Sequence, residues 1–308
     1  MHVTDVSFPN LGIYLHNLPK SFTVFGFEIA LYGVIIAAAM LIGTVVAARI
    51  AKKNSFDPEI IWDFVLYAII ISVICARLYY VIFQWDLYKG NLLSIFNIRQ
   101  GGLAIYGGVI GAFATVFVYS KIKKINPFLL GDISVPGLIL GQAIGRWGNF
   151  TNREVFGEYT DNVFAMRLPI DAVRSWDISD TLRKTIVEGT NYIQVHPTFL
   201  YESLWNLAVF ALLVVFWRKK KFNGEVILWY LGGYGLGRAW IEGIRTDQLY
   251  IPGTVVPVSQ VLAIVLVVFS IVMDIYIRNK ISSVSTKKVE AKAASENIAD
   301  TSEIQNGE

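Results

Sequence analysis

Apolar residues occur along this chain in long runs, and short stretches of polar residues separate them. Seven such runs can be counted, at residues 29–51, 60–83, 102–120, 127–147, 198–217, 226–244 and 255–277. An α-helix needs about 20 apolar residues to span the hydrocarbon core of a bilayer. The strands of a membrane barrel would instead alternate apolar and polar residues over about 10 positions. The pattern therefore predicts an all-α polytopic membrane protein with about seven transmembrane helices.

Basic residues follow every second apolar run, and the loops between these positions hold few of them. They are Arg49, Lys52 and Lys53, then Lys121, Lys123 and Lys124, then Arg218, Lys219, Lys220 and Lys221, and finally Arg278 and Lys280. Cytoplasmic loops of membrane proteins carry an excess of Lys and Arg. The placement therefore predicts an N-terminus outside the cell and a C-terminus in the cytoplasm. It also accounts for the net charge of +3, which does not indicate binding to nucleic acid.

The composition agrees with a membrane protein and gives no sign of a metal site. Hydrophobic residues make up 54% of the chain, and charged residues only 17%. The single cysteine, Cys75, lies inside the second apolar run, and the three histidines are scattered. No Cys/His spacing typical of zinc ligands is present, and no disulfide framework can form from one cysteine.

The same pattern divides the chain into a membrane domain, residues 1–281, and a tail. Residues 1–28 form an outer segment suited to the membrane interface, and residues 148–197 are the longest stretch outside the apolar runs. We expect residues 148–197 to form a small extracytoplasmic cap. Residues 282–308 are rich in Ser, Ala, Lys and Glu and almost free of aromatic residues. Such a segment buries too little apolar surface to fold, so we expect a disordered cytoplasmic tail.

Polar side chains crowd together at the outer end of the fourth apolar run. Arg146 is followed closely by Asn149, Asn152, Glu154 and Gly157. Charged and amide groups are costly at the edge of a membrane, and where they occur they mark functional sites. This stretch therefore predicts a site for a charged ligand.

Further ionisable and tyrosine residues, from other runs, fall at the same predicted depth. They are Tyr32, Tyr106, Glu202, Arg238, Glu242 and Arg245. The spacing of Arg238, Glu242 and Arg245 puts all three on one helical face. Arginine is suited to phosphate because its planar fork offers several fixed donors and stays charged. Several arginines at one depth predict a site for an anionic head group. Two alternatives remain at this point: Arg238 and Glu242 could form a structural ion pair, and Tyr32 and Tyr106 could be interfacial aromatic residues.

Residues 145–157, GRWGNFTNREVFG, strongly resemble the signature of the bacterial prolipoprotein diacylglyceryl transferases. Four other segments are similar to further motifs of that family and occur in the same order. They are 31–33 (LYG), 101–108 (GGLAIYGG), 196–202 (HPTFLYE) and 233–245 (GYGLGR, then Glu242 and Arg245). The resemblance extends over about residues 9–280, and the family's span count and orientation agree with the pattern of apolar runs.

The resemblance implies an enzyme of the bacterial cytoplasmic (inner) membrane that needs neither a metal nor an organic cofactor. It would move the diacylglyceryl group of phosphatidylglycerol to the thiol of the lipobox cysteine of a prolipoprotein, and release glycerol 1-phosphate. The implied partners are phosphatidylglycerol, prolipoprotein signal peptides and the surrounding membrane lipids. The residues expected to be essential are Tyr32, Arg146, Asn149, Glu154, Gly157 and Arg238, with Tyr234, Glu202 and Glu242 in support.

In this interpretation Arg146 and Arg238 hold the phosphate, with Arg245 beside them, and Asn149 and Asn152 orient the head group. Two carboxylates, those of Glu154 and Glu242, keep the arginines in place. Such an electrostatic arrangement stabilises the charge that grows on the leaving phosphate.

The sequence departs from some members of the family at Tyr106, where they have a histidine proposed as a base. An unperturbed tyrosine has a pKa near 10, far from neutral pH, so the histidine mechanism does not transfer directly. A tyrosinate stabilised by nearby arginines is one alternative.

Two other classes of function fit part of the pattern. An anionic lipid or anion transporter would use the same arginines, but it would also place ionisable groups at mid-membrane or on both sides and show repeated halves, and neither is evident. A receptor or scaffold would have no need for several arginines beside an Asn/Glu cluster at one depth.

Overall fold

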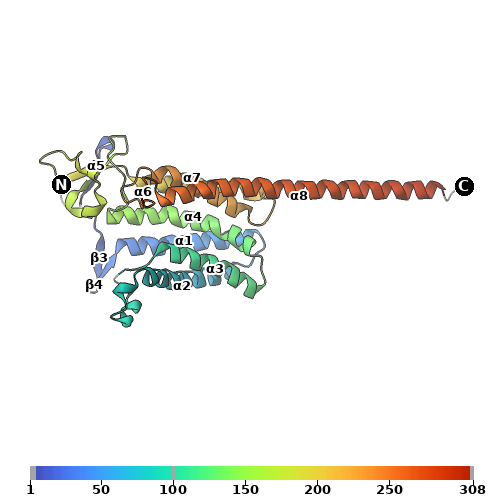
Figure 1. The fold of residues 1–308 in the computed structure, drawn as a ribbon, viewed down its shortest axis with the longest axis horizontal. Helices are drawn as coiled ribbons and strands as arrows, with labels where there is room; N and C mark the ends of the chain where they lie inside the picture. Colours follow the sequence, from blue (N-terminus) through green and yellow to red (C-terminus); the bar gives the residue numbers. More distant parts are fainter. Residues whose placement is uncertain (1–4, 99–100, 306–308) are drawn as a thin grey trace.

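The protein is a bundle of long helices with a small cap at one end (Figure 1). The structure, a computed structural model, describes residues 5–98 and 101–305, with side chains as far as residue 284. In this part of the chain, six helices are long and apolar enough to cross a membrane. They are α1 (Leu31–Lys53), α2 (Pro58–Phe83), α3 (Ile105–Lys123), α4 (Pro127–Asn152), α6 (Thr198–Phe216) and α8 (Val258–Gln305). The predicted all-α polytopic membrane fold is confirmed.

A seventh long helix, α7 (Glu225–Glu242), corresponds to the run predicted at residues 226–244. It is less apolar than the other six because it carries Glu225, Arg238 and Glu242. Strand β1 (Val6–Phe8) lies in the cap, whereas the last turns of α8 lie far beyond the opposite end of the bundle (Figure 1). Helix α7 packs against α8 in the bundle, and ends on opposite sides of the bundle agree with an odd number of crossings; that α7 is the seventh crossing stays a prediction.

The last helix, α8, continues through the segment that we expected to be a disordered tail. It runs without a break from Val258 to Gln305 and extends well past the bundle (Figure 1). Side chains beyond residue 284 and residues 306–308 lie outside the described part of the chain. The disordered tail stays a prediction.

Helices α2 and α4 begin with the residues that the backbone chemistry of a helix start requires. Each has proline at its first position, where a missing N–H costs no hydrogen bond. The Asp57 side chain accepts from the backbone N–H of Glu59 at 2.9 Å. The Asn126 side chain accepts from Phe128 N at 2.9 Å. These caps fix where the two helices enter the bundle.

Helix α4 is central and packs mainly against α1 and α6, while α2 pairs with α3 and α7 with α8. Glycines allow the closest crossing, between Gly43 of α1 and Gly137 of α4. A Cβ on either residue would overlap the backbone carbonyl of the other. Small residues allow such close approach of helices in membranes. This crossing sets the position of α4, and with it the position of the polar residues at its outer end.

The loop between α2 and α3 is held by a buried arginine on α2. Arg77 is only 7% exposed, and its guanidinium donates five hydrogen bonds of 2.7–3.2 Å to backbone carbonyls. The acceptors are Ser94, Ile95, Asn97, Gly101 and Gly102. All five donors of the guanidinium are therefore satisfied within the protein. Arg77 shapes this outer loop and leaves no donor for a ligand.

The cap contains a four-stranded antiparallel sheet in the order β2-β1-β5-β6. Its strands are β1, β2 (Ile13–Leu15), β5 (Met166–Pro169) and β6 (Tyr192–Val195). Apolar residues of the sheet, among them Val6 and Leu168, pack with Phe150 of α4 and Phe199 of α6. The N-terminal segment thus joins residues 148–197 in one cap, which is fixed to the ends of α4 and α6. A second hairpin, β3 (Ser21–Val24) with β4 (Phe27–Ala30), leads into α1.

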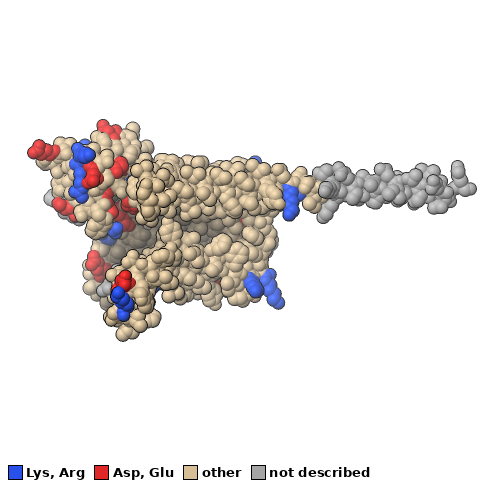
Figure 2. Space-filling model, viewed as in Figure 1, with Lys and Arg blue, Asp and Glu red and all other residues tan. Residues whose placement is uncertain are grey.

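Charged side chains are confined largely to the two ends of the bundle (Figure 2). Lys, Arg, Asp and Glu mix over the cap, and a broad band of uncharged residues follows it. The charges visible at the opposite end are mostly Lys and Arg. The uncharged band matches a bilayer belt, and the basic end matches the predicted cytoplasmic side. The orientation itself stays a prediction.

Candidate functional site

Three arginines converge on one buried carboxylate, that of Glu202 in α6, which is 4% exposed. Arg146 of α4 places Nη2 2.5 Å from Oε2 of Glu202. Arg238 of α7 places Nη1 3.4 Å from the other oxygen, Oε1. Arg245, just after α7, places Nη1 3.6 Å from Oε1. The structure therefore brings together four residues that the sequence predicted at one depth.

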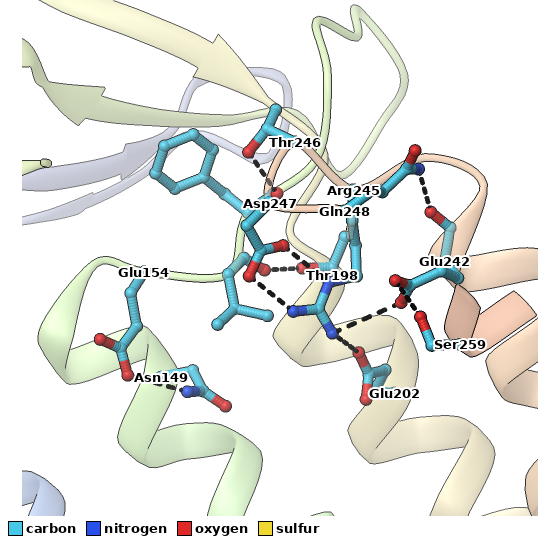
Figure 3. A network of polar contacts seen from close by, with 12 residues as sticks. Asn149, Glu154, Thr198, Glu202, Glu242, Arg245, Thr246, Asp247, Gln248 and Ser259 are labelled. Atoms are coloured by element: carbon cyan, nitrogen blue, oxygen red, sulfur yellow. Dashed lines mark hydrogen bonds and ion pairs between the residues drawn. The ribbon is translucent and has the colours of Figure 1, made fainter. Parts of the chain in front are cut away.

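Glu242 extends this cluster on the α7–α8 side. It lies 2.7 Å from Nη2 of Arg238, one helical turn away. Its carboxylate also accepts from the hydroxyl of Ser259, at the start of α8, and its carbonyl accepts from the side chain of Gln248. Figure 3 shows the contacts of Glu242 with Ser259 and Gln248, beside Arg245 and Glu202. Glu242 therefore fixes Arg238 and also joins α7 to α8.

The guanidinium of Arg245 is occupied by carboxylates of the protein. Nε and Nη2 bind Asp247 at 2.9 and 2.7 Å, and Nη1 faces Glu202 and Glu242. Burial opposes ionisation of Asp247, but the hydrogen bond and charge of Arg245 outweigh it and hold the pKa of Asp247 below its usual range. Burial likewise opposes the charge on Arg245, and its carboxylate partners outweigh that effect and raise its pKa. Arg245 thus supports the cluster from within.

A second carboxylate, that of Glu154, organises the amides next to Arg146. Its Oε1 accepts from Nδ2 of Asn149 at 3.0 Å and from Nδ2 of Asn152 at 3.4 Å. Asn149 in turn accepts from Nη1 of Arg146 at 3.3 Å. The two carboxylate-centred groups therefore form one continuous network, and Asn149 connects them.

Besides Asp247, sequence reasoning missed another charged member of this network, Arg174. It lies in a cap loop, and its Nη2 binds Oε2 of Glu154 at 3.0 Å. Another cap contact lies close by, in which Lys20 donates to the carbonyl of Ala172 at 2.8 Å. Burial, and then the charges of Arg153 and Arg174, lower the pKa of Lys20. No spacing rule relates residue 174 to residue 154, so only the folded cap could reveal the pair.

A tight turn after α4 directs Glu154 back toward Asn149. Arg153 and Val155 have φ of 56° and 59°, a region that is unusual for a β-branched residue such as Val155. Arg153 is 2% exposed and donates to the carbonyl of Leu18 at 2.5 Å. The carbonyl of Val155 accepts from the hydroxyl of Thr198. Contacts with the N-terminal segment and α6 therefore hold a strained turn at the edge of the site.

Gly157 has a packing reason to be glycine. It forms an isolated antiparallel bridge with Arg245, and its N–H donates to the carbonyl of His196 at 3.0 Å. A Cβ at this position would lie 2.6 Å from the carbonyl oxygen of Ile244. Three chain segments therefore meet at Gly157, which ties the Arg245 loop to the turn after α4. Its predicted part in substrate binding stays a prediction.

The three tyrosines singled out from the sequence lie in different surroundings. Tyr32, near the start of α1, packs its ring on Gly148 of α4, where a Cβ would lie 2.8 Å from Cδ2. Tyr234 stacks on Tyr230 with ring centroids 5.8 Å apart. Tyr106 is 42% exposed, and its ring packs against that of a neighbouring tyrosine on α2, with ring centroids 6.4 Å apart. The structure places Tyr32 beside the network but does not bring Tyr106 into it.

The exposed fractions of the arginine side chains indicate which of them can meet a ligand. Arg146 is 21% and Arg238 17% exposed, against 9% for Arg245. The three arginines face three carboxylates, those of Glu202, Glu242 and Asp247, so their formal charges cancel. Arg146 and Arg238 are therefore the two arginines of the cluster whose donors are more accessible, and the cluster as a whole offers directed donors rather than net charge.

The polar groups of the site are mainly guanidinium, carboxylate and amide groups. Among the described residues, no group of three or more His, Cys, Asp and Glu could hold a metal ion. The carboxylates of the network are hydrogen-bonded to guanidinium and amide groups instead. That the protein needs no cofactor stays a prediction.

Comparison with known proteins agrees with this geometry. The family model described as "Prolipoprotein diacylglyceryl transferase" matches residues 19–276, which include the helices from α1 to α7, the first part of α8 and the whole network. The chain belongs to the prolipoprotein diacylglyceryl transferase family. The resemblance carried by residues 145–157 is therefore confirmed.

Curated relatives in this family are similar over most of their length. Several are named phosphatidylglycerol–prolipoprotein diacylglyceryl transferase. The one from Listeria welshimeri is 45% identical to this chain, and the alignment covers 82% of this chain and 86% of the relative. One from Clostridioides difficile is 40% identical over 84% of this chain and 95% of its own length. One from Bacillus velezensis is 40% identical over 85% of this chain and 93% of its own length.

Proposed function

We propose that this protein transfers the diacylglyceryl group of phosphatidylglycerol to the thiol of the lipobox cysteine of prolipoproteins. The products are a thioether-linked lipid and glycerol 1-phosphate, in the first step of lipoprotein maturation. Membership of the family and the names of the relatives support this assignment. The observation that carries it is the convergence of two partly open arginines, Arg146 and Arg238, on the two oxygens of Glu202.

In this proposal the phosphate of the lipid binds to the exposed donors of Arg146 and Arg238, those that Glu202 does not occupy. Glu202 holds the two guanidinium groups on either side of one carboxylate, so their spacing is fixed before the lipid arrives. Asn149 is held by Glu154 and completes the set of donors and acceptors for the head group. Preorganised donors of this kind stabilise charge as it develops, without reorganisation during the reaction.

The nucleophile belongs to the second substrate. A cysteine thiol has a pKa near 8.5, and nearby cationic groups favour the reactive thiolate. The thiolate sulfur attacks the carbon of the diacylglyceryl group that is bonded to the phosphate oxygen, and a carbon–sulfur bond forms as that carbon–oxygen bond breaks. The electron pair of the broken bond goes to the phosphate oxygen, which Arg146 and Arg238 stabilise. The proton lost by the thiol is balanced by the proton that glycerol 1-phosphate takes up from water.

Tyr106 is the weakest of the proposed catalytic residues. A base has to lie within hydrogen-bond reach of the proton that it removes, and the described contacts of Tyr106 lie on α2 rather than in the network. Tyr32 lies closer, against Gly148. We keep both as candidates, and the position of Tyr32 favours it.

We further propose that the protein lies in the bacterial cytoplasmic membrane with its site toward the outer leaflet. Phosphatidylglycerol would then enter laterally, and the signal peptide would deliver its cysteine at the same depth. The network lies where α4, α6 and α7 meet the cap. An anion transporter would need charged groups along the middle of the crossing as well, whereas the buried ion pairs of the described residues lie toward the two ends of the bundle, in the network and at Asp132 and Glu225. This distribution favours the transferase.

The deciding experiment uses purified full-length protein, labelled phosphatidylglycerol and a lipobox peptide. We expect a thioether product from the wild type, and none from Arg146→Ala or from a peptide with Ser in place of the lipobox Cys. Binding of the lipid without any product from the folded wild type would contradict the transferase and favour the transporter.

A further inference from the structure

A cavity of about 670 Å³ lies between α6, α7 and α8, at the end of the bundle away from the cap. Its volume is in the range of pockets that bind small molecules. It is separate from the arginine network, and no step of the proposed reaction uses it. Its lining residues are Val209, Leu212, Leu213, Phe216, Lys219, Lys221, Trp229, Gly233 and Arg278.

The inner wall of this cavity is apolar. Val209, Leu212 and Phe216 lie on one face of α6 because they are spaced by three and four residues. Gly233 of α7 lets α6 and α7 pack closely at the floor of the cavity, since a Cβ there would lie 2.8 Å from Val209 Cγ1. Leu212 is 55% exposed. A wall of this kind suits an acyl chain.

The rim of the cavity is cationic. Three lysines follow one another after α6, and the middle one, Lys220, binds the buried Asp132 at 3.1 Å. The lysines on either side of it, Lys219 and Lys221, line the cavity instead. Within the described part of the chain, no ion pair involves Lys219 or Lys221, and Lys219 Nζ lies 4.7 Å from the ring centroid of Phe216.

The third cation of the rim is fixed in place by acidic neighbours. Arg278 lies 2.6 Å from Glu225 and 2.9 Å from Asp274. The two carboxylates hold its guanidinium at the mouth of the cavity. The charge available to a ligand therefore comes chiefly from Lys219 and Lys221.

We propose that this cavity binds one anionic phospholipid from the membrane leaflet on the side away from the cap. An acyl chain lies against α6 and Trp229, and the phosphate lies between Lys219 and Lys221. Charge complementarity identifies the occupant, because a lipid combines an apolar chain with an anionic group at the depth where wall and rim meet. The positive-inside rule accounts for basic residues on this side but not for two of them at the rim of an apolar cavity.

The test is a competitive photo-crosslink at a single position in the full-length protein. The photoreactive residue p-benzoylphenylalanine replaces Leu212 in the cavity, or Leu66 on the exposed face of α2 as the matched control. The protein is placed in vesicles that contain equal amounts of phosphatidic acid and phosphatidylethanolamine with different chain masses. Mass spectrometry then gives the ratio of the two crosslinked lipids at each position.

We expect phosphatidic acid to be enriched about 30-fold at position 212 and not at position 66. Each of the two lysines near the anionic lipid contributes about 1 kcal/mol, and the two together correspond to this factor. The double variant Lys219→Gln/Lys221→Gln should lose this enrichment. The control double variant Lys52→Gln/Lys53→Gln, which changes the last turn of α1 at the same end of the bundle, should keep it. Equal ratios at positions 212 and 66, or enrichment that survives the double variant, would overturn the proposal. Transfer activity is measured in parallel and should be unchanged in both variants, so failure of the lipid site is distinguishable from failure of the transferase.

Discussion

At the scale of single residues, the site depends on how two arginines are held rather than on their charge alone. Arg146 and Arg238 share Glu202, and Glu242 gives Arg238 a second carboxylate. Arg146 therefore has the lesser share of carboxylate contacts, and its side chain is the more exposed of the two. A planar guanidinium can bind Glu202 with one nitrogen and a phosphate with the others, which a lysine cannot do.

The change Arg146→Lys keeps the charge and removes the fork. We expect kcat of the transfer reaction to fall about 100-fold or more, the usual effect of losing one donor to a developing anion. The measurement is transfer to a lipobox peptide under saturating lipid. Arg183→Lys, on the exposed surface of the cap, is the matched control and should keep full activity. Equal activity of Arg146→Lys and the wild type would exclude a bidentate phosphate contact.

The cap contributes to the site through Arg174, which we expect to position Glu154. The change Arg174→Gln removes a charged partner of Glu154, so Asn149 loses part of its orientation. Because Arg174 is 55% exposed, the effect is modest, and we expect kcat/KM to fall about 10-fold. Arg174→Lys should restore part of the activity, whereas a purely structural role would change the unfolding temperature and leave the kinetics of the folded protein unaltered.

His196 makes the stability of the cap junction depend on pH. Burial lowers its pKa, and its Nδ1 lies 3.3 Å from the hydroxyl of Tyr201. An unfolded histidine has a pKa near 6.5, so below that pH the unfolded state binds the proton more readily than the folded one. The unfolding temperature should therefore be constant above about pH 7 and fall as the pH is lowered to 5.5. His196→Gln should flatten this dependence, and the same slope in His196→Gln and in the surface control His16→Gln would contradict the assignment.

At the scale of helices, glycine contacts set the positions of the elements that carry the site. The crossing of α1 and α4 places Gly43 against Gly137, so α4 cannot shift without separating the two backbones. Arg146 and Asn149 lie near the end of the same helix. Packing in the middle of the bundle therefore determines the geometry of the network at its outer end.

The change Gly43→Ala tests this crossing, and Gly33→Ala on the same helix is the matched control. The added methyl at position 43 meets the carbonyl of Gly137, whereas no atom lies within 4 Å of a Cβ at Gly33. We expect Gly43→Ala to cost about 1–3 kcal/mol, and Gly33→Ala to be neutral or slightly stabilising because alanine favours helix. Thermal unfolding in detergent measures both. Equal unfolding temperatures of the two variants would show that the crossing adapts.

The helices also show how much of the fold the apolar pattern could predict. The runs predicted at 29–51 and 60–83 agree closely with α1 and α2. The pattern could not show that α8 continues to Gln305, nor that β1 pairs with β5 through Ser7 and Arg167. Hydropathy detects the cost of burying a segment in lipid, and it carries no information on which distant strands will pair.

At the scale of the whole molecule, the two ends of the bundle have different roles. The cap end carries charges of both signs and the arginine network, and the other end carries mostly basic residues (Figure 2). The arrangement predicts that the cap lies outside the cell. The N-terminal strand lies in the cap, and the last helix leaves the bundle at the other end. This arrangement is compatible with the orientation that places the basic loops in the cytoplasm.

Cysteine labelling in intact cells tests this orientation. With Cys75→Ala as background, Glu188→Cys in the cap should react with a membrane-impermeant maleimide. Lys53→Cys, at the other end of α1, should react only after the membrane is permeabilised. Both positions are exposed, so access to the reagent depends on the side of the membrane. The opposite labelling pattern would reverse the predicted topology, and it would move the site to the cytoplasmic side.

The sequence by itself determined the membrane class, the long apolar helices and the residues that had to be explained at one depth. These features follow from the bilayer, which acts on each segment separately through length, hydropathy and charge. Only the tertiary structure decided that Arg245 is occupied by Asp247, that Arg174 reaches Glu154, and that Tyr106 stays outside the network. Each of these depends on where backbones far apart in sequence come to lie, because an ion pair needs its two groups within a few ångströms and spacing along one helix cannot fix that distance.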